Sequence, residues 1–195
     1  MEILPRAFYD RDTLEVARDL LGKYLVHRVD GMELVVRITE TEAYIGAVDK
    51  ACHAYGGRRT ARTETLYAQP GTAYVYLIYG MYHCLNFVTE PEGTAAAVLL
   101  RGVEAVAGTD LMARNRFGRD WNELTAYQRK NFLNGPGKVC KALAITRTHN
   151  GLDLTGGNEL FLCDGTAPAG EIHVGKRIGI DYAEEAVDFP WRFWL

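Results

Sequence analysis

The sequence predicts a single α+β domain, in which an antiparallel curved β-sheet is surrounded by helices and carries a protruding β-hairpin. Three observations predict this fold class. The chain has 195 residues, of which 48% are hydrophobic and 24% charged, as in an ordinary globular domain. Strand-like segments follow one another across tight turns, which favours antiparallel pairing. No internal repeat, low-complexity segment or long linker divides the sequence, so residues 1–195 are expected to form one domain.

The first predicted elements are a helix and a hairpin. Asp12 followed by Glu15 is a typical capped helix start, and residues 13–21 carry apolar side chains at helical spacing. Segments 24–29 and 32–44 then flank an Asp-Gly dipeptide. This dipeptide between two strand-like segments is a strong hairpin signal.

A long connection and a second hairpin follow. Residues 45–69 are polar and predict a functional connection with short helical pieces, while residues 72–88 predict two strands turning at Gly80-Met81. Seven of the eleven tyrosines lie between Tyr44 and Tyr82. A two-residue turn places Tyr79 beside an exposed tip, where an aromatic side chain suggests stacking on a flat ligand or insertion between bases. Core packing in a half-buried strand is the alternative interpretation.

The second half of the chain predicts a mixture of helices and strands from its apolar periodicity. The elements in order are a strand at 94–103, helices at 108–117, 123–133 and 137–145, and strands at 158–163 and 171–180.

Charge is distributed unevenly along the chain. The net charge is −3, which argues against a protein coated in basic patches. Residues 114–147 nevertheless hold eight Lys and Arg against two acidic residues, a local charge of +6. One electropositive face that meets an anion is one interpretation, and a solvated helical face is the other.

The protein is expected to be cytoplasmic, and to associate with the nucleoid if it is bacterial. The longest nearly apolar run, residues 73–81, is far too short to cross a bilayer, and the first residues lack the layout of a secretion signal. The four cysteines contain no C-x-x-C pair and are expected to be reduced, buried thiols.

Two carboxylates are candidates for chemistry. Glu40 and Glu42 lie two apart in an extended segment and therefore share one face. Such a pair suits acid–base hydrolysis of a glycosidic bond, and a solvated acidic edge is the alternative. The adjacent pairs Cys52-His53 and His83-Cys84 point to opposite faces of a strand, so no metal site is expected.

The segment Gly135-Pro-Gly-Lys138 is similar to phosphate-binding loops but lacks their upstream Gly and their Ser or Thr. Nucleoside triphosphate hydrolysis is therefore not expected. The main chain at Gly137 and the Lys138 side chain could instead hold one DNA phosphate.

Six motifs in order resemble the alkyladenine (3-methyladenine) DNA glycosylase family, across essentially the whole chain. They are 38–47 (ITETEAYIGA), 53–58 (HAYGGR), 71–86 (GTAYVYLIYGMYHCLN), 98–101 (VLLR), 134–145 (NGPGKVCKALAI) and 177–180 (RIGI). The resemblance implies monofunctional excision of damaged purines from double-stranded DNA, by base flipping and hydrolysis of the N-glycosidic bond, without metal or cofactor. A monomer is expected.

The resemblance also implies roles for individual residues. Glu42 is the general base for water, Arg101 helps to hold that water and the carboxylate, and the main chain of Ile178 completes the water site. Of the stacking residues, Tyr44 and His53 form one wall of the base pocket.

On the other side of this pocket the resemblance places Tyr76. Asn86 shapes the pocket against the exocyclic amine of guanine, and Tyr79 wedges into the minor groove. A two-residue turn would pair Val75 with Asn86, which puts Asn86 and Tyr76 on opposite faces. A bulge or a different turn would reconcile the two expectations.

Two other functions remain open. A hydrolase of free nucleosides or other N-glycosides could use Glu40 and Glu42, although it would need neither the basic stretch nor an exposed wedge. A non-catalytic module that flips and holds lesions would tolerate loss of Glu42.

Overall fold

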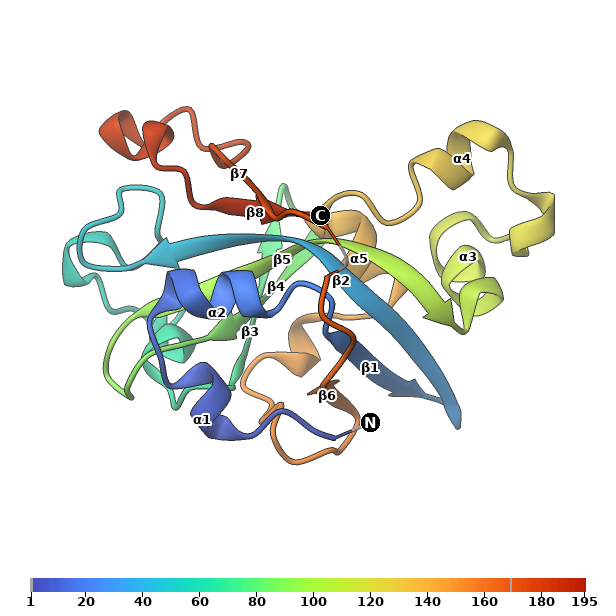
Figure 1. Ribbon diagram of the computed structural model, residues 1–195, viewed down its shortest axis with the longest axis horizontal. Coiled ribbons are helices and arrows are strands. Elements are labelled where there is room, and N and C mark those ends of the chain that lie inside the picture. The colour runs from blue at the N-terminus through green and yellow to red at the C-terminus, as the bar shows by residue number, and fades with distance from the viewer. Residues whose placement is uncertain (1, 169) are drawn as a thin grey trace.

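A curved antiparallel β-sheet organises the computed structural model, which describes residues 2–168 and 170–195 (Figure 1). Six strands follow in the order β3-β4-β5-β2-β1-β6, and β8 with β7 extends the sheet beside β2. The predicted fold class is confirmed. The strands are β1 (Tyr24–Val29), β2 (Met32–Ile45), β3 (Ala73–Ile78), β4 (Tyr82–Val88), β5 (Ala96–Ala107), β6 (Leu160–Cys163), β7 (His173–Gly175) and β8 (Arg192–Trp194).

Strand β2 is the longest strand and carries the bend of the sheet. Its first half pairs with β1, and at Glu40–Glu42 the short strand β8 replaces β1 as the neighbour. The pairing of β2 with β5 is irregular on both sides of Glu40. Such irregularities locally bend and twist a strand. The bend therefore lies where the two candidate carboxylates stand.

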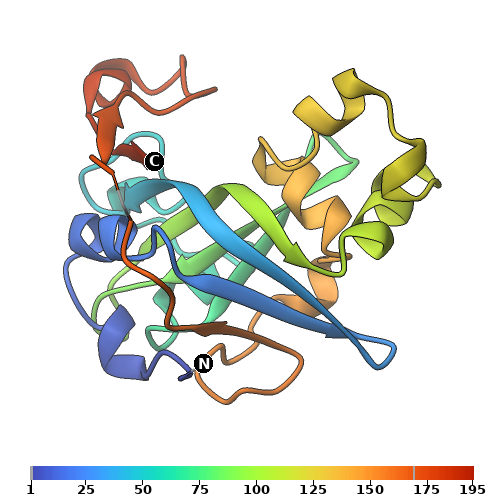
Figure 2. The same cartoon turned by 45° about the vertical axis from the view of Figure 1, so that its right-hand side comes forward.

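Helices surround the sheet. They are α1 (Arg6–Tyr9), α2 (Thr13–Asp19), α3 (Thr109–Phe117), α4 (Ala126–Lys130) and α5 (Pro136–Ala142). Asp12 caps α2 by accepting from the Leu14 and Glu15 main chain, as the sequence predicted. After β5 the chain makes an excursion through α3 and α4 and returns as α5, which lies beside the β3–β4 hairpin (Figure 2).

The main core lies on one face of the sheet, because alternate strand residues point to it. Val75, Leu85, Phe87, Val98 and Leu100 belong to this core. The residues between them in the sequence point to the opposite face. That second face carries the candidate site.

The predicted two-residue turn of the second hairpin is wrong. Ile78 pairs with Tyr82, so the turn has the three residues Tyr79, Gly80 and Met81. Tyr79 and Gly80 both adopt left-handed backbone conformations, with φ of 53° and 69°. The longer turn shifts the register by one residue and pairs Asn86 with Tyr74.

Several other boundaries differ from the sequence predictions. The helix expected at 123–133 is confined to α4, and the strand expected at 171–180 is confined to β7. Residues 178 and 179 lie in a loop and line the cavity described below. All four cysteines are buried and unpaired, as expected. Within residues 2–168 and 170–195, no helix is long and apolar enough to span a membrane.

Candidate active site

A cavity of about 430 Å³ opens on the face of the sheet opposite the main core. It brings together residues that lie far apart in the sequence and that the sequence singled out. Those that line it are Tyr44, His53, Tyr76, Tyr79, Asn86, Arg101 and Ile178. Glu42 lies at its edge and is fully buried, while three of its contact partners line the cavity.

Strand register explains why these side chains meet. Asn86 of β4 pairs with Leu99 of β5, and Leu99 pairs with Glu42 of β2. Directly paired residues of an antiparallel sheet share a face, as do residues two apart on one strand. Arg101 and Tyr44 therefore join the same face. The corrected hairpin register adds Asn86 to the face that carries Tyr76 and removes the conflict noted from the sequence.

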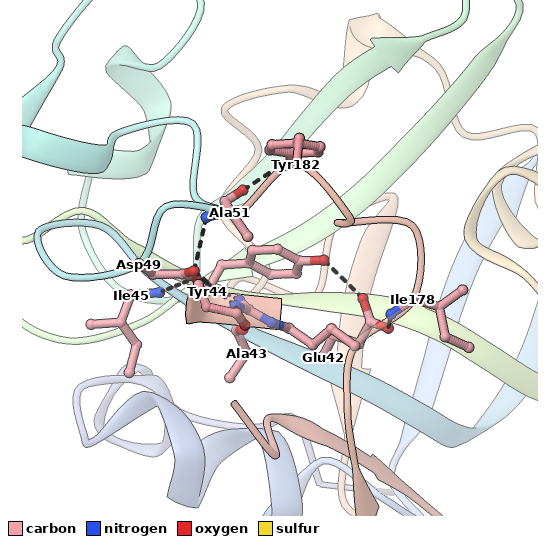
Figure 3. A network of polar contacts seen from close by, with 10 residues as sticks. Glu42, Ala43, Tyr44, Ile45, Asp49, Ala51, Ile178 and Tyr182 are labelled. Carbon is pink, nitrogen blue, oxygen red and sulfur yellow. Dashed lines mark hydrogen bonds and ion pairs between the residues drawn. The ribbon is translucent and has the colours of Figure 1, made fainter. Parts of the chain in front are cut away.

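Glu42 is held by two hydrogen bonds and one ion pair. Its Oε1 accepts from the Ile178 main-chain N–H at 2.9 Å, and its Oε2 accepts from the Tyr44 hydroxyl at 2.8 Å (Figure 3). Arg101 Nε lies 3.4 Å from Oε1 but donates its hydrogen to Glu40. Burial raises the pKa of Glu42, although each of these three contacts favours its ionised form. A carboxylate has about four acceptor positions, so acceptor positions remain free for a further donor such as water.

The neighbouring Glu40 has a different environment. Its Oε1 accepts from Arg101 Nε at 2.9 Å and from Arg192 Nη1 at 3.0 Å. Glu40 does not line the cavity, whereas Arg101 does. Glu40 is thus an arginine partner that orients Arg101 toward Glu42, which argues against an acid–base pair made of the two carboxylates.

Aromatic rings form the walls of the cavity. His53 packs against Tyr76 with ring centroids 4.6 Å apart, and its Nδ1 lies 3.0 Å from the Tyr74 hydroxyl. The expected grouping of His53 with Tyr44 stays a prediction, because an edge-on contact of His53 with Tyr76 does not assign either ring to one side of a bound base. Burial, together with Arg62 and Arg58, lowers the pKa of His53 to about 4, so this ring is neutral at pH 7.

Asn86 is fixed in the floor of the cavity. Its Nδ2 donates to the Tyr74 carbonyl at 3.1 Å, and only 4% of the residue is exposed. This bond uses the amide nitrogen and sets the orientation of the side chain.

Two exposed tyrosines lie at the mouth. Tyr79 is 80% exposed on the hairpin turn, which confirms its predicted position at an exposed tip. Tyr182 is 68% exposed and lines the same cavity from the C-terminal segment. The sequence reasoning missed Tyr182, because nothing in its local sequence indicates that this segment returns to the cavity.

The basic stretch does not form one uniform surface. Arg116 and Arg129 donate to main-chain carbonyls within residues 121–132, and Arg114 pairs with Asp120. These cations hold the excursion around α3 and α4 in place. The local charge of +6 therefore overstates the number of cationic side chains that are free to bind an anion.

The start of α5 lies against the hairpin. A side chain at Gly137 would meet Tyr82 at 2.9 Å, so glycine allows this close approach. Pro136 lines the cavity, whereas Gly137 and Lys138 do not. Lys138 is half-buried and its Nζ donates to Asn134 Oδ1 at 2.8 Å. Among residues 2–168 and 170–195, no group of three His, Cys, Asp or Glu could hold a metal ion.

Comparison with known proteins decides the family. The family model described as methylpurine-DNA glycosylase (MPG) matches residues 7–195. The chain belongs to this family. A relative from Clostridium perfringens strain SM101 is 53% identical over 194 residues, covering 98% of this chain and 95% of its own.

Two further relatives agree with this assignment. One from Alkaliphilus oremlandii strain OhILAs is 55% identical over 192 residues, covering 98% of this chain and 95% of its own. One from Desulfitobacterium hafniense strain Y51 is 50% identical over 195 residues, covering 100% of this chain and 96% of its own. The names of all three relatives refer to 3-methyladenine DNA glycosylase. This protein is therefore a DNA glycosylase, which is a hydrolase of N-glycosyl bonds that acts in DNA repair.

Proposed function

We propose that this glycosylase flips alkylated or deaminated purines out of double-stranded DNA and hydrolyses their N-glycosidic bonds. The substrates are lesions such as 3-methyladenine, hypoxanthine and ethenoadenine, and the enzyme acts as a monomer in the cytoplasm. The observation that carries the proposal is the position of Glu42, a buried carboxylate at the edge of an aromatic cavity, held by Arg101 and the Ile178 main chain.

Hydrolysis begins with water beside Glu42. A free acceptor position of the ionised carboxylate binds the water, while Arg101 keeps the carboxylate oriented. The base leaves with the electrons of the N-glycosidic bond, and the Glu42 carboxylate stabilises the positive charge of the oxocarbenium-like sugar. The water oxygen then bonds to the anomeric carbon of the sugar as Glu42 takes the proton of the water. The raised pKa of Glu42 supports this role, because it brings the group closer to neutral pH.

The aromatic walls bind the extruded base. Tyr44 and His53 stack on one side of the base and Tyr76 on the other, so that varied purines can bind without a full set of hydrogen bonds. All three rings line the cavity, which supports this role. Asn86 lies on the cavity floor, where a bulky or wrongly placed amine would meet it.

Tyr79 fills the place that the extruded nucleotide leaves in the duplex. Its exposed ring on a protruding turn suits insertion from the minor groove. Lys138 and the main chain at Gly137, beside the hairpin, contact the DNA backbone.

The test uses duplex oligonucleotides that each contain one lesion base: hypoxanthine, ethenoadenine or 3-methyladenine. After incubation with chelator, released free base is measured by chromatography and abasic sites are cleaved with hot alkali. The proposal predicts free base and one strand break for at least one lesion, and no hydrolysis of the corresponding free nucleosides. Hydrolysis of nucleosides alone, or binding without release, would contradict it.

A further inference from the structure

We propose that the buried ion pair between Arg177 and Asp49 is a positioning pair. It holds both the Tyr44 ring and the Ile178 main-chain N–H in place, and so couples the wall of the base pocket to the candidate general base. This inference rests on the proposed function for its catalytic consequence, and on geometry alone for the positioning itself.

The pair is fully enclosed. Both side chains have no exposed surface, and Arg177 Nη1 and Nη2 contact the two Asp49 oxygens at 2.5 and 2.7 Å. The same nitrogens donate to the carbonyls of Ala43 at 2.9 Å and Ala186 at 3.1 Å. Arg177 Nε is buried and has no hydrogen-bond partner among the residues that the structure describes.

A buried ion pair is by itself weak evidence for a contribution to stability. Replacing a buried ion pair by well-packed apolar side chains is often neutral or stabilising, because two charges must lose their water. The unpartnered Nε adds a further cost. The contacts of the pair suggest a positional role instead.

On one side the pair contacts the base wall. The Arg177 guanidinium lies 4.6 Å from the centre of the Tyr44 ring, and the Tyr44 ring lines the cavity. The hydroxyl of the same ring donates to Glu42. The guanidinium thus holds the Tyr44 ring, whose face lines the cavity and whose hydroxyl donates to the Glu42 carboxylate.

On the other side the pair fixes the water site. Ile178 directly follows Arg177, and its N–H donates to Glu42 (Figure 3). Asp49 Oδ1 also accepts from the Ala51 N–H at 2.9 Å, in the connection that leads to His53. One ion pair therefore ties together the end of β2, this connection and the C-terminal loop, and each of these segments contributes lining to the cavity.

The first test needs no substrate. In wild-type protein labelled with ¹⁵N, the Ile178 amide signal is expected to follow the ionisation of Glu42 when the pH is varied. In the double variant Asp49→Asn/Arg177→Met, which removes both charges together, that signal should lose this dependence. An unchanged Ile178 titration in the folded double variant would overturn the proposal.

The second test measures catalysis. Under single-turnover conditions the double variant should excise a lesion base about 100-fold more slowly, as expected for a misplaced catalytic group. The variant Arg177→Lys keeps the charge but cannot hold two carboxylate oxygens and two carbonyls at once, so it should show the same losses even if the double variant does not fold. Either variant with the wild-type rate would overturn the catalytic consequence.

A matched control separates positioning from general destabilisation. Met112→Ala creates a cavity in the core away from the site, and should lower the melting temperature while it leaves the Ile178 titration and the rate unchanged. If wild-type protein released no lesion base, the proposed function would fail, and the Ile178 titration would still decide the positioning claim.

Discussion

Removing one hydroxyl group from the base wall should change the pH dependence of excision. In Tyr44→Phe the ring remains for stacking, but Glu42 loses the donor that lies 2.8 Å from its Oε2. A hydrogen bond to a charged group contributes about 1.5–3 kcal/mol, and a change of one pKa unit corresponds to about 1.4 kcal/mol. Loss of this donor disfavours the carboxylate, so the pKa of Glu42 should rise.

The sign of the effect follows from the reactive form. In the proposed mechanism the Glu42 carboxylate accepts the proton from water, so the rate is expected to fall as pH drops through the pKa of Glu42. The acid limb of the rate profile in Tyr44→Phe should therefore lie at higher pH than in wild type, by about 1 to 2 pH units. The rate above that limb should stay within a few-fold of wild type.

Single-turnover release of hypoxanthine from a duplex, measured between about pH 4.5 and 9, tests this expectation, because the ordinary pKa of a glutamate lies just below this range and that of Glu42 is raised. Tyr74→Phe is the matched control, because the Tyr74 hydroxyl contacts His53 and not Glu42. An acid limb that is the same in wild type and Tyr44→Phe would refute the reasoning.

Three other outcomes are expected. Tyr79→Ser should weaken binding to lesion-containing duplex by about 1–3 kcal/mol in fluorescence anisotropy, the value of one aromatic stack, and undiminished affinity would remove the wedge role. Tyr182→Ala should weaken the same binding by about 1–3 kcal/mol, because an exposed ring at the mouth of the cavity can contact the extruded nucleotide. Tyr182→Phe keeps the ring and should bind like wild type. Glu42→Gln should raise the melting temperature measured by calorimetry at pH 7.5. The pKa of Glu42 is higher in the folded than in the unfolded state, so the stability that Glu42 contributes is lost as pH rises through the folded-state pKa. Glutamine carries no charge and avoids this loss. A lower melting temperature in that variant would contradict the direction given for this pKa.

Much of the sheet could be predicted from local signals. The Asp-Gly turn fixed the pairing of β1 with β2, and the apolar spacing after Asp12 indicated α2. Glu42 and Arg101 could be expected in one site only through the motif resemblance, since β2 and β5 are distant in the sequence. The register that brings them together follows from the folded sheet.

The errors have physical causes. The turn was predicted one residue too short because Tyr79 adopts a left-handed conformation that sequence rules reserve mainly for Gly and Asn. The contacts of Arg177 with Asp49 could not be predicted, because 128 residues separate them. The basic stretch could not reveal that Arg116 and Arg129 bind carbonyls of an irregular segment.

The most direct test of the central claim compares Glu42→Gln with Glu40→Gln. Both changes remove one carboxylate charge from the same strand, but only Glu42 accepts from the Ile178 main chain beside the cavity, while Glu40 contacts two arginines. Excision of hypoxanthine and binding to the lesion duplex are measured for each variant. The account predicts that Glu42→Gln loses turnover by several orders of magnitude and still binds the lesion, and that Glu40→Gln retains measurable turnover. Near-native turnover in Glu42→Gln, or a larger loss in Glu40→Gln than in Glu42→Gln, would contradict it.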